Sequence, residues 1–436
     1  MKIKFILTAI LIMNLVIARA QDSLQKQIDV LKEEVKSLKS DENSHFMVRG
    51  FAQFGMDATS SAMNFNMTSF NPVLLWRQGS NFLFESELEM EYMNNEFSLD
   101  IGYANATYLV TKGLSVKVGK ILIPFGTFSE RLHPSWVNKL STAPLGMGHM
   151  DGMSPMADIG IDVRGGLQIG LSKLNYSFYV VNGPRLDDGK STPTDAGKLT
   201  FENANDNNNN KAIGSRIGFL PFTNSSLEIG VSAYYAKPGS ETSPFAGDTM
   251  NQNLNYKNVT AMLTAFDLTY VKQLSPISGV IDIRGQYNLS NVSNATYYSS
   301  IDSMQYTFTN KSSAYYVQFS YRPSMVDNDI LRNFELVTRY SAYTTPKYSL
   351  WYSDQTQMEI GLNYWIGWRS VIKFSYQYTD GTIAGTGTSG MAGMPGMSNG
   401  RLAHATTPTT TTTSTSSSEM GTSNGYMFLL HLAIGL

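Results

Sequence analysis

Four glutamates alternate with mostly apolar residues in the stretch FLFESELEMEY, at Glu85, Glu87, Glu89 and Glu91. If this stretch is a β-strand, the four carboxylates lie on one face and are spaced about 7 Å apart. Burying such a row in a protein core would be very costly, because each unpaired charge would lose its hydration. The face must therefore meet water or cations, either on the solvent side of a sheet or in the wet lumen of a barrel.

A second group of chemically distinctive residues occupies the stretch MGHMDGMSPM, which contains Met147, His149, Met150, Met153 and Met156. Thioether and imidazole groups are soft donors suited to Cu(I), and methionines three residues apart can chelate in a flexible loop. Methionine is also a common filler of irregular apolar packing. Both interpretations, a copper-type metal site and simple packing, are open at this stage.

Signals of catalysis are poor, because the chain lacks the G-x-S-x-G and H-E-x-x-H motifs and a phosphate-cradling glycine loop. His431 is expected on the inner face of its strand, where it could meet Asp or Ser groups as in a barrel hydrolase. One inward histidine among many lumen residues is the simpler interpretation. The sequence therefore predicts a protein that is not an enzyme and requires no cofactor.

Composition excludes several classes of protein. Charged residues make up 16% of the chain, well below the roughly 25% of typical soluble domains. A net charge of −2 gives no indication of a nucleic-acid partner. The chain has no cysteine, which excludes a disulfide framework and thiolate metal sites.

Residues 1–20 have the three parts of a secretory signal peptide. Lys2 and Lys4 form a positive beginning, residues 5–17 an apolar core, and Ala18-Arg19-Ala20 a cleavage site before Gln21. No other apolar run is long enough for a membrane-spanning helix. We therefore expect an exported protein without a helical anchor.

Residues 21–44 show the heptad spacing of a short coiled coil. The seam consists of Leu24, Ile28, Leu31, Val35 and Leu38. A helix this short is marginal on its own, so the segment is expected to support a larger oligomer. An amphipathic helix that lies on the barrel or on a partner is the alternative.

From Phe46 onward the pattern changes to short runs in which apolar and polar residues alternate. Sixteen runs are expected as strands. Most of them have a length close to the ~9–11 residues with which a tilted strand crosses a bilayer. They are 46–54, 70–78, 82–92, 97–109, 114–121, 157–168, 174–181, 212–219, 227–235, 259–271, 277–289, 312–322, 331–343, 357–367, 370–380 and 426–436. This number and length favour an all-β fold, a 16-stranded antiparallel transmembrane β-barrel with a short N-terminal coiled-coil helix.

The connections between the runs alternate in length, as in outer-membrane barrels. The long ones are 58–69, 122–156, 182–211, 237–258, 290–311, 344–356 and 381–425, and the break at 93–95 is a short exception. Tyr235 and Tyr340 fall at the loop ends of their strands, and Tyr270 and Trp368 at the turn ends. Such positions match the two aromatic girdles of a membrane barrel. A secreted β-sandwich also alternates, but it would need neither girdles nor one-sided loop lengths.

Inward strand positions carry charges of both signs, with a modest excess of acids. Besides the four glutamates, the expected pore-lining residues are Arg49, Arg77, Lys117, Arg164, Arg216, Arg284 and Arg339. The segment 122–156 adds Glu130, Arg131, His133 and Lys139 as candidates for a constriction. Opposite charges on facing walls would favour polar solutes over apolar ones.

The segment VGKILIPFG at 118–126 resembles the G-K-x-x-x-P-F-G stretch of the phosphate-selective porin O and P family. Arg49-Gly50, YYVQFSYRP at 315–323 and FELVTRYS at 334–341 are also similar to its Bacteroidetes-type members. The resemblance implies a trimeric 16-stranded channel in which the third external loop folds inward as a constriction. The order of the runs independently makes 122–156 the third loop.

One departure from that family concerns its substrate. Its phosphate-selective members line the constriction with Arg and Lys, which supply charge-assisted hydrogen bonds to phosphate. Here the segment offers Arg131, His133 and Lys139 against Glu130 and Asp151. Transport of phosphate is therefore open, and so is the choice between cations and anions.

The sequence thus predicts a signal peptide (1–20), a periplasmic coiled-coil segment (21–44) and an outer-membrane porin domain (45–436). The expected function is passive diffusion of small hydrophilic solutes or ions, with outer-membrane lipid as the surroundings and a homotrimer as the assembly. The alternative is a channel that binds copper-type metals through its Met/His-rich loops.

Overall fold

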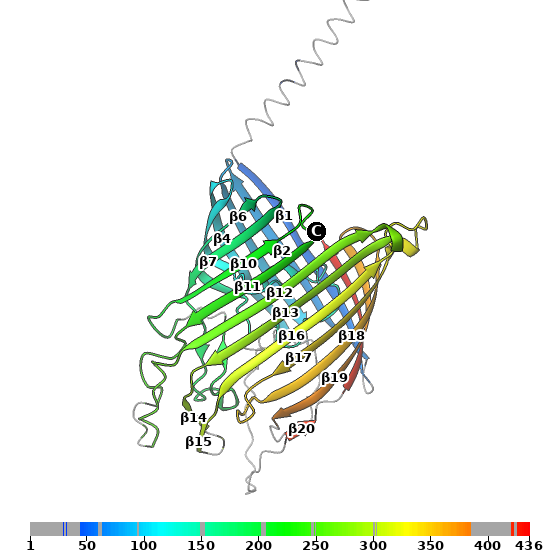
Figure 1. Cartoon of the computed structure of the whole chain (residues 1–436). Coiled ribbons are helices and arrows are strands. Elements are labelled where there is room, and N and C mark those ends of the chain that lie inside the picture. Colours follow the sequence, from blue (N-terminus) through cyan, green and yellow to red (C-terminus); the bar gives the residue numbers. More distant parts are fainter. Residues whose placement is uncertain are drawn as a thin grey trace, which may run out of the picture.

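Alternating side chains produce sixteen long strands, which close into one antiparallel barrel in the computed structural model (Figure 1). The structure describes residues 29, 32, 44–59, 63–93, 96–148, 153–201, 206–245, 248, 250–299, 301, 303–384, 420–422 and 425–436. Consecutive long strands pair with each other, and β1 (Ser44–Ala58) closes the barrel by pairing with both β2 (Met63–Gln78) and β21 (Gly425–Gly435). The expected all-β fold of sixteen strands is confirmed.

The remaining barrel strands follow in chain order. They are β3 (Phe82–Met93), β4 (Glu96–Thr111), β5 (Leu114–Leu122), β6 (Ala157–Ile169), β7 (Ser172–Val181), β10 (Ala212–Leu220), β11 (Leu227–Ala236), β12 (Ala261–Leu274), β13 (Gly279–Val292), β16 (Asn310–Arg322), β17 (Phe334–Thr344), β18 (Ser353–Trp365) and β19 (Ser370–Ala384). The short strands are β8 (Arg185–Leu186), β9 (Leu199–Thr200), β14 (Thr296–Ser299), β15 (Met304–Thr307) and β20 (Met420–Thr422).

The described helices of the barrel domain are short. They are the π-helix η1 (Phe128–Leu132) and the 3₁₀ helices η2 (Pro193–Asp195), η3 (Ser275–Ile277) and η4 (Leu331–Asn333). Within the part of the chain that the structure describes, no helix has the length and apolar character needed to cross a membrane.

The two faces of the strands differ in the way a membrane barrel requires. In β18 the outward residues Met358, Ile360 and Leu362 are exposed, whereas the inward residues Glu359 and Asn363 are fully buried. An exposed apolar outer face would be unfavourable in water and is suited to lipid. The burial of polar inward residues shows that something inside the barrel covers them.

The connections separate the barrel into a turn end and a loop end. Figure 1 shows β14, β15 and β20 at the loop end and the C-terminus at the opposite end. At the loop end, Tyr256 and Phe308 stack on either side of Tyr297, with ring centroids 5.5 Å and 5.2 Å apart. Leu199 and Phe201 of the connection 182–211 belong to the same cluster of buried residues, so three of the long loops share an apolar core.

The expected long connection 58–69 is wrong. β1 extends to Ala58 and β2 begins at Met63, and the two strands remain paired up to Ala58 and Met63. A register shift between Gly55 and Met56 accommodates one extra residue in the ladder. Met63 and Phe65 alternate with Asn64 in this part of β2, but the register shift gives them the opposite parity to Phe70, which is exposed like them. The run 63–69 therefore did not continue the alternation of 70–78.

Candidate functional site

The segment between β5 and β6, of which residues 123–148 and 153–156 are described, runs inside the barrel. It begins with Ile123 and Phe125, whose side chains are fully buried. Gly126 follows with a φ of 66°, and a Cβ atom there would lie 2.2 Å from the side chain of Gln286 on β13. Glycine at this position lets the chain turn in direct contact with the wall. We call residues 123–156 the inner loop.

The beginning of the inner loop is bound through its backbone. The N–H of Gly126 donates to Ser232 Oγ on β11 at 3.0 Å. The N–H groups of Thr127 and Phe128 both donate to Gln286 Oε1, at 2.8 and 3.0 Å. Orphan N–H groups at the start of η1 are thus satisfied by the barrel wall, as a buried helix start requires.

The middle of the inner loop is bound through charged groups. Lys139 Nζ lies 3.0 Å from Asp282 Oδ2 on β13, donates to Ser320 Oγ at 2.7 Å and forms an ion pair with Glu335 on β17. The carbonyl of Lys139 accepts a hydrogen bond of 2.7 Å from Asn363 Nδ2 on β18. One residue of the loop therefore contacts four strands.

Two residues of the barrel wall donate hydrogen bonds to oxygen atoms of the inner loop. Lys373 on β19 donates to the carbonyls of Ser135, Asn138 and Leu140, the last at 3.2 Å. Arg339 on β17 is buried and donates to the carbonyl and the hydroxyl of Thr142, at 2.9 Å each. Arg339 also forms a buried ion pair with Glu359, which accepts from the Thr142 hydroxyl at 2.8 Å.

The last described part of the inner loop packs on β13 and β16. Met147 Sδ accepts a hydrogen bond from Asn288 Nδ2 at 3.1 Å, and Asn288 also donates to Ser154 Oγ. At the base of the loop, the N–H of Ile123 donates to the carbonyl of Met156 at 2.8 Å. The described parts of the loop are therefore held against the inner face of the strands from β11 to β19.

A network of charges connects η1 with β6 and β11, which belong to the same run of neighbouring strands. Glu130 pairs with Arg164 on β6 at 2.5 Å, and Arg131 pairs with Glu228 on β11 at 2.9 Å. Burial alone would raise the pKa of the Glu130 carboxyl, but the nearby charges of Arg164 and Arg131 outweigh it and lower that pKa below its usual value. Glu130 is therefore held in its charged form.

The glutamate row lies on β3, away from the strands β11 to β19 to which the inner loop is hydrogen-bonded, and Glu87 within it is buried. Lys117 Nζ on β5 pairs with Glu85 at 2.8 Å, and Asn71 donates to Glu87 at 3.2 Å. A Cβ atom at Gly102 would lie 2.5 Å from Glu89 Oε1, which places that carboxylate over the inner face of β4. The row thus shares the interior with the loop, as the alternation predicted.

The other expected pore-lining arginines have different surroundings. Arg49 and Arg77 are exposed near the turn end, where Arg77 donates to the carbonyl of Gly79 at 2.9 Å. Arg284 pairs with Asp282 at 2.8 Å. Arg216 points inward but is buried against Asp267 and Glu228, as Arg339 is against Glu359. Arg216 and Arg339 therefore form ion pairs in covered parts of the wall, and a pore-lining role for this set stays a prediction.

The remaining candidates of the inner loop also stay predictions. His133 is partly buried directly after η1. Met147 and Met153 are buried, and Met153 packs in a cluster with Phe128 and Tyr316. Met156 is also buried, whereas His149 and Met150 lie outside the described residues. The buried thioethers match the packing interpretation, and the described residues contain no group of three or more His, Cys, Asp or Glu that could hold a metal.

The expected coiled-coil seam, Leu24, Ile28, Leu31, Val35 and Leu38, lies outside the described residues, as does the signal peptide. In that region the structure describes only Asp29 and Lys32, which are helical and lie 3.9 Å apart as an ion pair.

His431, the residue considered for a barrel hydrolase, lies near the closure of the barrel. Its Nδ1 is 2.6 Å from Gln53 Nε2, and its Nε2 is 3.2 Å from Asp57 Oδ1. These partners are a carboxamide and a carboxylate, and neither is a hydroxyl nucleophile of the kind that a histidine base activates.

Several residues that hold the inner loop were missing from the sequence-based candidates. Glu359 has the same strand parity as Gly361 and Asn363, so parity could have identified it. The same alternation does predict an inward side chain for Lys373 on β19. Gln286 likewise shares the parity of Asp282 and Arg284 on β13. Thr142 could not be found in this way, because its role depends on where an irregular loop meets the wall.

Comparison with solved structures shows the fold of outer-membrane porins. An anion-selective porin from Comamonas acidovorans superposes with a TM-score of 0.51 at 11% identity, over 90% of this chain and 100% of the porin. OmpF of Salmonella typhi, solved in complex with daunomycin, gives 0.51 at 9% identity, over 91% of this chain and 99% of OmpF. A loop-deletion mutant of OmpT, an outer membrane protein of Vibrio cholerae, gives 0.50 at 10% identity, over 90% and 100% of the two chains. No family model and no curated protein matches the sequence.

Proposed function

We propose that the protein is an outer-membrane porin, through which small hydrophilic solutes or ions diffuse passively. The observation that carries this proposal is the inner loop, which is fixed against the wall from β11 to β19 while the glutamates of β3 lie beyond it. A barrel that existed only to be rigid would not need a charged interior, because burying charge is costly. A charged, wet passage beside a fixed loop is suited to diffusion with a size limit.

The interior of the barrel selects solutes by their polarity as well as by their size. The acidic row of β3 lies on one side, and the loop contributes Arg131, whose side chain is 40% exposed and pairs with Glu228. Charges of both signs on an aqueous passage orient dipolar solutes and disfavour apolar ones. The proposed channel works without a cofactor and without catalysis, since diffusion requires only an open and hydrated path.

The solute class is the finer part of the proposal. The sequence resembles phosphate-selective porins, and a structure with the same fold is described as an anion-selective porin. In this chain, however, most bases of the inner region are paired with acids: Lys139 with Asp282, Arg216 with Asp267, and Arg164 with Glu130. Paired bases attract anions weakly, so we propose a channel for both kinds of ion, without strong preference for phosphate.

The surroundings follow from the same proposal. The chain would be exported with the help of residues 1–20 and inserted in the outer membrane of a Gram-negative cell, with its turn end toward the periplasm. Residues 21–44 would form a periplasmic coiled coil, and three copies would assemble as a trimer. The exposed apolar outer face, which includes Ile159, Phe266 and Ile360, would contact the lipid.

A thiol-labelling experiment in planar bilayers tests the channel directly. The chain has no cysteine, so Glu89→Cys introduces a single reactive thiol beside the proposed passage. A bulky, charged, water-soluble thiol reagent should then lower the single-channel conductance. Ile161→Cys, on the exposed outer face, is the matched control and should not respond.

Two outcomes would refute the proposal. A folded protein that gives no conductance steps in bilayers is not a porin. Conductance that is equally insensitive to the reagent in Glu89→Cys and Ile161→Cys would place the ion path elsewhere than beside β3.

A further inference from the structure

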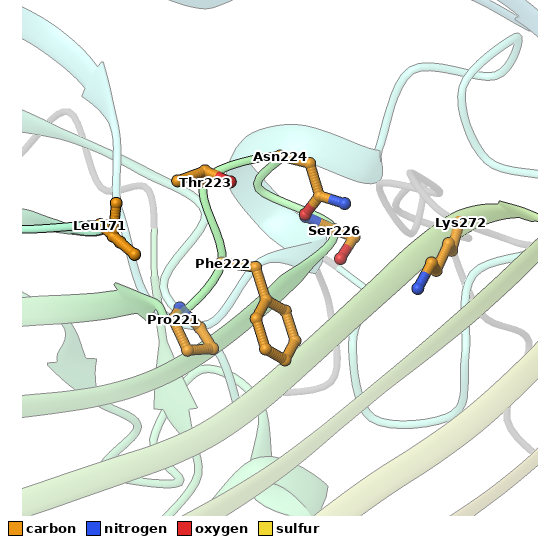
Figure 2. Close-up of a pocket in the computed structure, with 7 residues that line it drawn as sticks. All are labelled: Leu171, Pro221, Phe222, Thr223, Asn224, Ser226 and Lys272. Atoms are coloured by element: carbon orange, nitrogen blue, oxygen red, sulfur yellow. The ribbon is translucent and has the colours of Figure 1, made fainter.

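A small groove at the turn end of the barrel has features of a ligand site. It has a volume of about 320 Å³ and lies between the β6–β7 turn, the β10–β11 turn and the end of β12. Figure 2 shows Phe222 between Pro221 and Lys272 in this groove, with Leu171 on the far side. Leu171 and Phe222 expose much of their side chains there, so the groove combines an apolar surface with one ammonium group.

The β10–β11 turn that forms the groove has a fixed conformation. Ser225 adopts a φ of 54°, and its N–H donates to the carbonyl of Phe222 at 3.0 Å. From β7, Ser172 Oγ donates to the carbonyl of Pro221 at 3.0 Å, and Lys173 Nζ donates to Ser225 Oγ at 2.9 Å. A groove held in this way exists before a ligand arrives, which lowers the entropic cost of binding.

The strand register places Lys272 on the outer face of the barrel. In β12 it has the same parity as Phe266 and Leu268, whose side chains are exposed, and the opposite parity to Asp267, which is buried inside. Tyr270, two residues earlier on this face, is at the level where aromatic residues of a membrane barrel meet the lipid head groups. The ammonium group is therefore positioned at the membrane surface.

The charge of Lys272 is available to a ligand. Among the described residues it forms no ion pair or hydrogen bond, whereas Lys173 beside it is used to hold the turn. A lysine at a membrane surface binds anionic head groups, and its aliphatic stem can lie along apolar neighbours.

We propose that this groove binds one anionic phospholipid of the periplasmic leaflet. Lys272 contacts the lipid phosphate, while Phe222, Pro221 and Leu171 contact the upper part of an acyl chain. The choice of a lipid over a soluble anion follows from the apolar residues, which a free phosphate would leave unused. The inference depends on the proposed outer-membrane location, which puts the turn end at the periplasmic leaflet, and it does not depend on conduction.

Native mass spectrometry of the full chain in detergent micelles tests the proposal, with phosphatidylglycerol and phosphatidylcholine as probes. Phosphatidylglycerol should bind at lower concentration than phosphatidylcholine. Lys272→Gln should weaken phosphatidylglycerol binding about fivefold, the contribution of one lysine near an anionic surface. Phe222→Ser should weaken the binding of both lipids.

Lys112→Gln is the matched control, because Lys112 is an exposed lysine in another turn of the same rim. It should leave the binding of both lipids unchanged. Equal binding of phosphatidylglycerol to Lys272→Gln and to the unsubstituted protein would overturn the proposal, as would an equal loss in Lys112→Gln. Bilayer recordings of the same preparation separate the two proposals. A chain that conducts without preferring phosphatidylglycerol refutes the lipid site alone, and one that binds this lipid without conducting refutes the porin function alone.

Discussion

Lys373 is the residue whose replacement should release the inner loop most directly. Its ammonium group donates to the carbonyls of Ser135, Asn138 and Leu140, and its side chain is almost completely buried. Lys373→Met keeps the length of the side chain but removes its charge and its three donors. The carbonyls of the loop would then be buried without these partners or would have to move toward water.

The three hydrogen bonds that Lys373→Met removes set a lower bound on the loss of free energy that holds the loop to the wall. A buried polar group that loses its partner destabilises a structure by about 1–3 kcal/mol, so three carbonyls give at least about 3 kcal/mol if the loop does not move. That cost disappears once the loop leaves the wall, which raises the population of the detached loop by about a hundredfold. The barrel itself should persist, because β19 pairs with β18 and β21 through backbone groups that the substitution does not touch.

Single-channel recording is the appropriate assay, with heat-resistant barrel structure checked by circular dichroism. Lys373→Met should show larger or fluctuating conductance, since a loop that leaves the wall alters the passage. Lys112→Met, at an exposed turn position, should behave like the unsubstituted protein. If folded Lys373→Met shows the same conductance and the same noise, the ammonium group does not hold the loop and the reasoning fails.

Three further predictions concern other parts of the site. Glu89→Gln combined with Glu91→Gln should shift the reversal potential in a KCl gradient toward that of an anion-selective channel. The ratio of anion to cation permeability should rise roughly threefold per charge removed, for groups about 7 Å from the ion in water. Glu241→Gln, which removes the acid of a loop ion pair with Lys257, should cause no shift. The pKa of Glu130 is lowered in the folded state, so its stabilising effect is complete above the usual glutamate pKa and is lost as the pH falls through the lowered value. Conductance noise should therefore rise in acid below about pH 4, and Glu130→Gln should remove that pH dependence. Gly126→Ala should lower the thermal stability more than Gly79→Ala, because both glycines have φ near +60° but only Gly126 has a neighbour within reach of a Cβ atom; equal effects would show that the contact with Gln286 has no role.

The barrel was predictable from the sequence because its information is local and repetitive. Side chains alternate along each strand and short turns alternate with long loops, so strands such as 370–380 could be placed to within a few residues of β19. The extension of β2 back to Met63 was missed because the alternation changes phase there. The extra residue at the register shift gives Met63 and Phe65 the opposite parity to Phe70, so a single period does not cover the whole strand.

The contacts of the inner loop were not predictable, because each joins residues far apart in sequence. Thr142 meets Arg339 and Glu359, and Lys139 meets Asp282 and Glu335. The sequence showed which wall residues point inward, but an irregular loop has no period that assigns its residues to partners. The same limit applies to Met147, because no pattern in the sequence indicates that its thioether lies beside Asn288.

The charged anchors of the inner loop indicate what its fixation is for. A buried ion pair such as Arg339 with Glu359 contributes little net stability, because the desolvation of two charges offsets most of their attraction. An apolar contact would hold a loop as strongly, but it would tolerate several positions, whereas hydrogen bonds from Arg339 and Lys373 to particular loop oxygens allow only one. If the width of the passage determines which solutes cross, a loop with a single position gives a sharper size limit than a loop that is bound in several positions. The ion pairs therefore determine the position of the inner loop more than the strength of its binding. Replacement of Arg339 and Glu359 together by apolar residues should preserve the fold while broadening the distribution of conductance levels.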